Sequence, residues 1–158
     1  MIFVTVGTHE QPFNRLLEMV DALKLGTEIV VQYGFSTYPL KHCTPKRFVE
    51  FHEMRRLMSA AEAVVSHGGV GSIMLALSSG KCPLVVPRLH RFGEHVDDHQ
   101  IEVADAFARF GKVTLLKPGE GLVERLEEAR RQSGSHAIRP SSTLVEFLNN
   151  AIRASARS

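Results

Sequence analysis

The stretch that decides the fold is Val64-Val65-Ser66-His67-Gly68-Gly69-Val70-Gly71-Ser72-Ile73-Met74-Leu75-Ala76-Leu77. A short apolar run leads into a polar pair, then into a glycine cluster, then into a helical pattern of apolar residues. A strand that ends in a glycine turn and opens a helix points free backbone N–H groups, with the positive end of the helix dipole, at whatever lies above the turn. The stretch therefore predicts an anion site, most simply for a phosphate group, at the carboxyl edge of a parallel sheet.

The composition is that of one soluble globular domain. The chain has 158 residues, of which 44% are hydrophobic and 23% charged, and this is enough to bury a core. The formal net charge is only +2, so no basic field for nucleic acid is indicated and no nucleic-acid partner is expected. Cys43 and Cys82 form no CxxC pair, which indicates a reduced, cytosolic protein.

No apolar run approaches the roughly 20 residues that a membrane span needs. The apolar start, Met1 to Gly7, lacks the basic residues of a signal peptide and is interpreted as a strand. We therefore expect a cytoplasmic protein, which something else must hold if it works at a membrane.

Apolar runs and helical patterns alternate along the chain. Buried strands are expected over residues 1–6, 28–33, 63–66, 83–87 and 113–116, with a possible short one at 47–51. Helices are expected over residues 13–23, 52–61, 72–79, 99–110 and 122–131. The alternation predicts an α/β fold with a doubly wound, Rossmann-like parallel sheet, in which the loops after the strands share one edge.

The domain organisation follows from the same pattern. A single α/β domain is expected over residues 1–132, a polar linker over 133–142 and an amphipathic C-terminal helix over 143–158. The apolar stripe of that helix could complete the core or dock on a partner.

The glycine turn has two interpretations. Its glycines could only allow a tight strand-to-helix turn with close packing, or they could bare a helix N-terminus for phosphate. The GxGxxG spacing is missing, so a dinucleotide site is not supported.

The loop Gly7-Thr8-His9-Glu10-Gln11 also has two interpretations. It could admit a phosphate, with His9 as base or donor, or it could be an ordinary connection with Thr8 as cap.

The third motif is the polar stretch from Arg88 to Gln100. His95 and His99 lie four residues apart around Asp98, a spacing that a metal site can use. The following helix is expected to begin near Asp98 and leave His95 before it, so no metal is predicted. Asp98 and Gln100 could hydrogen-bond a sugar, or Asp98 could simply cap the helix.

Together these residues resemble the C-terminal, donor-binding half of GT-B glycosyltransferases of the family-28 type, along almost the whole chain. The matching motifs are the opening Met1–Phe13, the donor loop Ser66–Gly69, and Val86–Arg88 followed by Phe92–Gln100. The chain is most similar to the small subunits of bacterial capsule and exopolysaccharide transferases. The cytosolic subunits of dolichol-linked N-acetylglucosaminyltransferases are similar eukaryotic proteins.

The resemblance implies a set of donor-binding residues. The turn from His67 to Ser72 would cradle a diphosphate, and Asp98, His99 and Gln100 would touch the transferred sugar. The full implied set is Gly7, Thr8, Gln32, Gly34, His67, Gly68, Gly69, Gly71, Ser72, Arg88, Glu94, His95, Asp98, His99 and Gln100.

The implied function is that of a UDP-sugar-binding subunit. A membrane-anchored partner would supply the acceptor-binding half, recruit the chain to the cytoplasmic face of the membrane, and usually carry the catalytic base. In this chain the candidate base is His9. A hexose would be added to a polyprenyl-diphosphate-linked sugar in capsule or exopolysaccharide synthesis, with no cofactor and no metal.

One position departs from the family pattern. In the complete relatives a Glu on the helix after the glycine turn binds the uridine ribose, and here that position is Leu75. A leucine accepts no hydrogen bond from a hydroxyl group. This supports an alternative, in which the chain is a non-catalytic activator or stabiliser of a membrane-bound glycosyltransferase.

Overall fold

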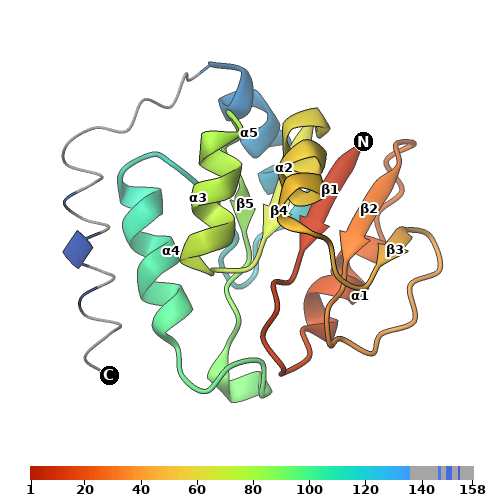
Figure 1. Cartoon of the computed structure of the whole chain (residues 1–158), viewed down its shortest axis with the longest axis horizontal. Helices are drawn as coiled ribbons and strands as arrows, with labels where there is room; N and C mark the ends of the chain where they lie inside the picture. The colour runs from red at the N-terminus through yellow and green to blue at the C-terminus, as the bar shows by residue number, and fades with distance from the viewer. Residues whose placement is uncertain (136–145, 147–148, 151–152, 154–158) are drawn as a thin grey trace.

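Six parallel strands of the computed structural model form one sheet, in the order β3-β2-β1-β4-β5-β6 (Figure 1). The structure describes residues 1–135, 146, 149–150 and 153. The strands are β1 (Ile2–Thr5), β2 (Ile29–Gln32), β3 (Thr44–Lys46), β4 (Ala63–Ser66), β5 (Leu84–Val85) and β6 (Thr114–Leu115). The helices are α1 (Asn14–Asp21), α2 (Phe51–Ala60), α3 (Val70–Ser78), the 3-10 helix η1 (His90–Phe92), α4 (His99–Arg109) and α5 (Leu122–Ser135).

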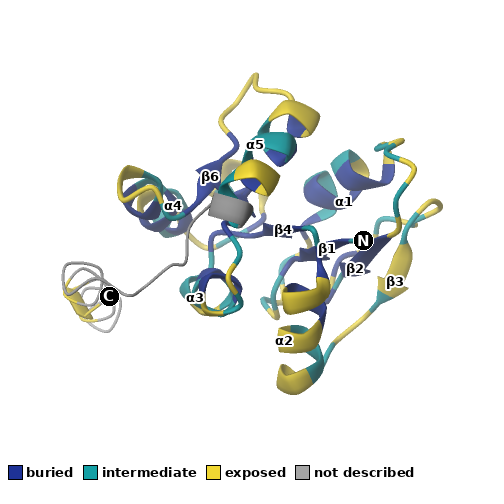
Figure 2. Ribbon diagram, turned by 90° about the horizontal axis from the view of Figure 1, so that it is seen from above, coloured by how far each residue is buried: buried dark blue, intermediate teal, exposed yellow. Residues whose placement is uncertain are grey.

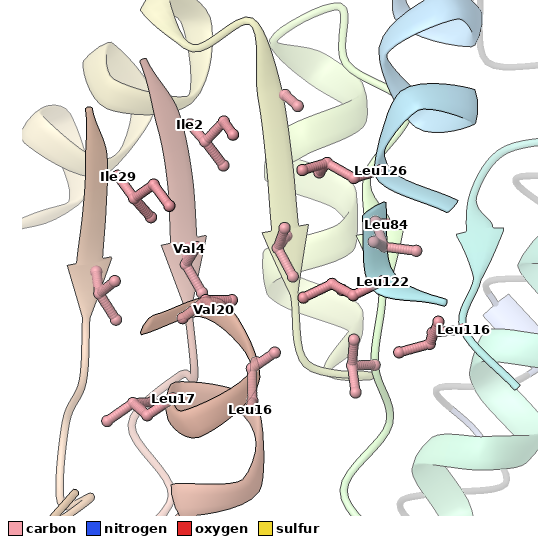
Figure 3. Packing of buried hydrophobic residues seen from close by; sticks show 14 of the residues in the cluster. Ile2, Val4, Leu16, Leu17, Val20, Ile29, Leu84, Leu116, Leu122 and Leu126 are labelled. Atoms are coloured by element: carbon pink, nitrogen blue, oxygen red, sulfur yellow. The ribbon is translucent and has the colours of Figure 1, made fainter. Parts of the chain in front are cut away.

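The helices cover both faces of the sheet, α1 and α5 on one side and α2, α3 and α4 on the other (Figure 2). Every residue of β1, β2 and β4 is buried, as expected for central strands with helices on both faces. The core under α1 and α5 is drawn in Figure 3, and includes Ile2, Val4, Leu16, Leu17, Val20, Leu122 and Leu126. On the other face, Phe3 and Val64 pack against α2 and α3.

The strand order confirms the doubly wound α/β fold. From β1 the chain builds outward to β2 and β3, and it then returns to place β4 on the other side of β1. The connections after β1 and β4 therefore diverge and leave a crevice between them, which is where ligands bind in open α/β sheets. The two central strands are in register over four residue pairs, from Ile2 beside Ala63 to Thr5 beside Ser66.

The expected strand at 47–51 is wrong. The third strand is β3, at Thr44–Lys46, and α2 already begins at Phe51. The apolar residues that suggested a strand point outward, since Phe48 is 47% exposed and Phe51 72%. Pro45 is tolerated in β3 because this is an edge strand.

Helix α5 runs to Ser135, so residues 133–135 of the expected linker are helical. The Ser133 hydroxyl accepts a hydrogen bond from the Cys82 N–H at 2.9 Å and donates to the Ala129 carbonyl at 3.0 Å. These bonds tie the end of α5 to the entry of β5. The rest of the linker and the apolar stripe expected on the C-terminal helix lie outside the described residues.

Helix α3 starts two residues earlier than expected, at Val70. Within the described residues, no helix has both the length and the apolar character needed to cross a bilayer.

Candidate functional site

A pocket of about 300 Å³ lies at the carboxyl ends of β1, β2 and β4. The predicted site residues that line it are Gly7, Thr8, Gln32, His67, Gly69, Gly71 and Ser72. Residues at the ends of three neighbouring parallel strands therefore meet at one place, at the crevice between β1 and β4. Gly34, Gly68, Arg88, Glu94, His95, Asp98, His99 and Gln100 do not line this pocket.

The N-terminus of α3 opens onto the pocket. Gly69 occupies the N-cap position with an extended backbone, and no side chain caps this helix. The N–H groups of Val70, Gly71 and Ser72 belong to the first helical turn, where no intrahelical acceptor exists. A Cβ added at Gly71 would meet nothing within 4 Å. The geometry is that of an anion site, with several donors and the helix dipole directed at one open space.

His67 forms the floor of the crevice between two glycines. A Cβ on Gly7 would lie 2.5 Å from the imidazole Cε1, and one on Gly69 would lie 2.3 Å from Nε2. Gly7 also has φ +76°, which a side chain would strain. Close packing therefore requires both glycines, whereas Gly71 faces open space. The turn therefore combines the two features expected of it, close packing at Gly69 and an open helix N-terminus at Gly71.

Burial keeps the His67 imidazole neutral. The side chain is 8% exposed, and within the described structure its Nδ1 has no hydrogen-bond partner. Desolvation is the main cause that lowers the pKa of His67 to about 4, and the positive charge of Arg88 adds to it. The imidazole at this site is therefore a neutral polar group at physiological pH.

Gln32 holds the loops around the pocket together. Its Oε1 accepts a hydrogen bond from the Thr5 hydroxyl at 2.6 Å, and its Nε2 donates to the carbonyls of Gly7 and Arg47 at 3.1 Å. The backbone of Gly34 packs closely against that of Gly7, because a Cβ on Gly34 would lie 2.9 Å from the Gly7 carbonyl oxygen. The amide group is satisfied by the protein itself, so Gln32 shapes the wall of the pocket.

Arg88 is fully buried and binds backbone carbonyls. Its guanidinium donates to the carbonyl oxygens of Val6 at 2.7 Å, Gln11 at 2.6 Å and Glu94 at 3.0 Å. The ring of Phe13 lies under it, 4.9 Å from centroid to Cζ. Burial lowers the pKa of Arg88 to about 10, which the Glu94 carboxylate opposes, so the group stays charged. The structure turns this residue inward, where it joins the loop after β1 to the loop after β5.

Glu94 and Gln100 connect the loop after β5 to α1 and to the glycine turn. Glu94, 3% exposed, accepts two hydrogen bonds of 2.9 Å from the Arg15 guanidinium of α1. The Gln100 side-chain oxygen accepts from the N–H groups of Gly68 and Arg88, each at 3.2 Å. A Cβ on Gly68 would lie 2.8 Å from the Gln100 Cβ. This packing fixes the start of α4 against the glycine turn.

The start of α4 differs from the simple capping expectation. Asp98 occupies the N-cap position, but its carboxylate accepts from the His90 N–H at 2.9 Å instead of capping the helix. The neighbouring Asp97 accepts from the His99 N–H at 3.0 Å. The position of Asp98 as N-cap residue is therefore confirmed, but its side chain makes no capping hydrogen bond, and Asp97 bonds the first residue of α4 instead.

His9 and His95 are in contact with each other, although neither lines the pocket at the crevice. Their rings stack with centroids 4.5 Å apart and planes 26° apart. His9 Nε2 lies 2.9 Å from the Gln11 side-chain oxygen, and His95 Nδ1 lies 3.2 Å from Asp97 Oδ1. The stack brings the loop after β1 against the loop that leads to α4. Within the described residues no three His, Cys, Asp or Glu side chains are arranged to hold a metal ion.

An apolar wall of the pocket was not anticipated from the sequence. It is made by Phe48, Val49 and Met54. Val49 and Met54 also pack against the core cluster under α2, as does Leu75 of α3. The signal that could have found this wall is that these residues follow β3, at the same edge as the glycine turn.

A second and larger pocket, of about 610 Å³, lies farther along that edge. Its walls come from α1, α4 and the segments after β5 and β6, and include Met19, Leu89, Phe92, Ile101 and Leu116. Asp98 is the predicted site residue that lines it.

Residues 1–153 match the model of the glycosyltransferase family 28 C-terminal domain. The chain is 32% identical over 136 residues to the UDP-N-acetylglucosamine transferase subunit ALG13 of Yarrowia lipolytica, which covers 76% of this chain and 65% of that protein.

Solved structures show the same fold. The calicheamicin glycosyltransferase CalG4 matches with a TM-score of 0.58 at 18% identity, over 96% of this chain and 36% of that one. MurG of Acinetobacter baumannii matches with a TM-score of 0.54 at 19% identity, over 92% of this chain and 48% of that one. The chain thus spans less than two thirds of the length of each of these proteins.

Proposed function

The chain belongs to the family of glycosyltransferase family 28 C-terminal domains, and from this membership we propose that it binds the nucleotide-sugar donor of a two-subunit glycosyltransferase. The donor would be a UDP-hexose. A membrane-anchored partner would bind the acceptor, a sugar linked to a polyprenyl diphosphate, and hold the chain at the cytoplasmic face of the membrane. Capsule or exopolysaccharide synthesis is the setting we propose for the reaction.

The observation that carries the proposal is the uncapped N-terminus of α3, open to a pocket at the crevice between β1 and β4. The diphosphate would accept hydrogen bonds from the N–H groups of Gly71 and Ser72, with the Ser72 hydroxyl beside them. A doubly charged ligand gains most from fixed dipoles of this kind, because they need no reorganisation when charge develops.

The nucleoside would lie along the apolar wall of Phe48 and Val49. Those side chains line the same pocket as Gly71 and Ser72, so a ligand of nucleotide size can reach both. Leu75 packs, like Val49, against the core cluster under α2 and offers no acceptor to a ribose hydroxyl.

The chemistry is attack by an acceptor hydroxyl on the anomeric carbon of the sugar. The bond from that carbon to the β-phosphate oxygen breaks, and its electron pair leaves with UDP. The α3 N-terminus would stabilise the charge on the leaving diphosphate. His9 is stacked on His95 and within hydrogen-bond distance of Gln11, so we assign the base to the acceptor-binding partner.

The partner is supported by the likeness to a protein whose name describes it as a transferase subunit. The alternative is a chain that activates or stabilises a partner that is active by itself, and Leu75 is the observation that favours it.

A substitution at Gly71 tests the diphosphate site without disturbing the fold. Gly71 is exposed and has open space around it, and an aspartate in the first turn of a helix stabilises the helix. In Gly71→Asp the new carboxylate would repel the diphosphate by up to about 4 kcal/mol, the value for like charges about 4 Å apart near a protein surface. We expect UDP binding, measured by calorimetry on the complex with the partner, to weaken at least about tenfold, while Gly71→Asn stays close to the parent.

The second part of the test is transfer itself. The reconstituted pair should transfer sugar from one member of a panel of UDP-hexoses, and the isolated chain should not. A purified chain that turns over alone would contradict the division of labour. If the complex transfers sugar normally, yet binds no UDP at this subunit and tolerates Gly71→Asp, the chain is a non-catalytic activator of its partner.

A further inference from the structure

We propose that this chain has a surface of its own for an anionic lipid bilayer, formed by Phe35, Arg47, Phe48, Phe51 and Arg55. We call these five residues the aromatic–arginine surface. They belong to the segment after β2 and to the segment from β3 into α2. The inference concerns membrane contact by the chain itself and does not depend on donor binding.

The aromatic side chains of this surface are unusually exposed. Phe51 is 72% exposed, Phe48 47% and Phe35 41%. Single exposed apolar residues are normal on a soluble protein, but a group of them marks an interaction site. Phe35 and Phe48 are in contact, edge to face, with ring centroids 5.3 Å apart. Exposed phenylalanines beside cations are the composition of a surface that inserts at the headgroup level of a bilayer.

The two arginines leave positive charge free beside these rings. The Arg47 guanidinium lies 6.0 Å from the Phe35 ring centroid and 5.6 Å from that of Phe48. Arg55 follows Phe51 by four residues on α2, so both lie on one side of the helix. No ion pair with a carboxylate involves Arg47 or Arg55 in the described part of the chain.

The nearby carboxylates offset only part of this positive charge. Glu53 accepts from Lys46 at 2.9 Å and lies 3.8 Å from Arg56, and the hydrogen bond with Lys46 lowers the pKa of Glu53. Glu50 lies 3.5 Å from His52, which compensates its charge only when the imidazole is protonated. The segment from β3 into α2 nevertheless carries Lys46, Arg47, Arg55 and Arg56 against Glu50 and Glu53, and this excess of positive charge is complementary to phosphatidylglycerol and similar headgroups.

Hydrogen bonds hold the backbone of the aromatic–arginine surface in place at Arg47. The Arg47 carbonyl accepts hydrogen bonds from the Gly34 N–H at 2.9 Å and from Gln32 Nε2 at 3.1 Å, which fixes the backbone beside the sheet. Figure 2 shows β3 and the outer side of α2 as exposed. Phe48 also lines the pocket at the α3 N-terminus. A bilayer on this surface would consequently lie next to the mouth of that pocket.

Vesicle binding by the full chain tests the proposal. We expect it to cosediment with vesicles of phosphatidylcholine mixed with phosphatidylglycerol, far less with phosphatidylcholine alone, and less as salt is added. Arg47→Gln and Arg55→Gln should each weaken partitioning about fivefold, as expected for one basic residue near an anionic surface. Phe51→Ser should weaken it about tenfold, the lower end for burying one phenylalanine. Phe48 is left unchanged because it lines the pocket.

Matched controls come from α5. Val123 is 41% exposed and Arg131 is exposed, so Val123→Ser and Arg131→Gln remove similar groups away from this surface. Both variants should bind vesicles like the parent. A parent chain without affinity for anionic vesicles would overturn the proposal, as would surface variants that bind like the controls. Loss of binding to a protein partner, with no vesicle binding in the parent, would assign the surface to that protein instead.

Discussion

Replacing Gly69 by alanine puts one methyl group where the structure has no room for it. Gly69 has φ −76° and ψ 131°, a conformation that alanine adopts without strain. The only obstacle is packing, because the new Cβ would lie 2.3 Å from His67 Nε2 and 3.0 Å from Cδ2, where ordinary contacts are 3.4–4 Å. The imidazole has little free space toward Gly7 either, because it lies so close to that residue that even a Cβ there would be only 2.5 Å from the ring.

The size of the effect follows from this confinement. Overpacking a well-packed site costs about 1–3 kcal/mol. His67 is 8% exposed and enclosed on two sides, so we expect Gly69→Ala to cost about 2–3 kcal/mol in the free energy of unfolding. The measurement is urea denaturation at neutral pH.

Two further variants make the reasoning refutable. In Gly71→Ala the new methyl group meets nothing within 4 Å, so stability should be unchanged or rise by up to about 1 kcal/mol. Removing the imidazole should remove the clash, so Gly69→Ala should cost much less in a His67→Ala background than in the parent. Equal costs in the two backgrounds, or a Gly69→Ala variant within about 0.5 kcal/mol of the parent, would refute the packing argument.

Three other predictions follow from single side chains. Arg88→Met leaves three backbone carbonyls without their buried donor, and should cost about 3 kcal/mol or more in urea denaturation. Arg88→Lys should also be destabilised, because one ammonium cannot span the same carbonyls. The pKa of His67 is about 4 in the folded chain against 6.5 for the free side chain. The unfolded chain therefore takes up the proton first, and stability should fall by up to about 3 kcal/mol as pH drops from 6.5 to 4, with a smaller slope in His67→Gln. Leu75→Glu restores a carboxylate on α3 and should tighten UDP binding about tenfold by calorimetry, as for one hydrogen bond to a charged group; an unchanged affinity would mean that this position does not reach the ribose.

The fold was largely predictable because its signals are local. The run from Ala63 to Ser66 is apolar on both faces, as a central parallel strand must be, and it forms β4 with those bounds. The prediction of a strand over residues 47–51 was wrong because Phe48 and Phe51 are residue types that favour strands, although both are exposed in the structure. Hydrophobicity alone cannot tell a side chain that packs from one that faces water.

The site was predictable in place but not in detail. Gly69 was singled out as part of a ligand loop, yet the reason for its lack of a side chain is an imidazole two positions earlier. The family resemblance implies Arg88 as a donor-binding residue. Its actual partners are carbonyls of Val6, Gln11 and Glu94, which are far from one another in sequence. No local pattern reports such a convergence.

The motif residues of this crevice therefore have two different tasks. The side chains of Gln32, Arg88 and Gln100 form hydrogen bonds with backbone groups of neighbouring loops. These residues therefore set the shape of the pocket. The α3 N-terminus is what remains open to a ligand, at Gly71 and Ser72. Substitutions in the first group must change stability and ligand binding together, because the same bonds hold the loops that form the site. Only substitutions in the second group can separate recognition of a donor from the integrity of the fold, and for that reason Gly71 is the position where the function of this chain can be decided.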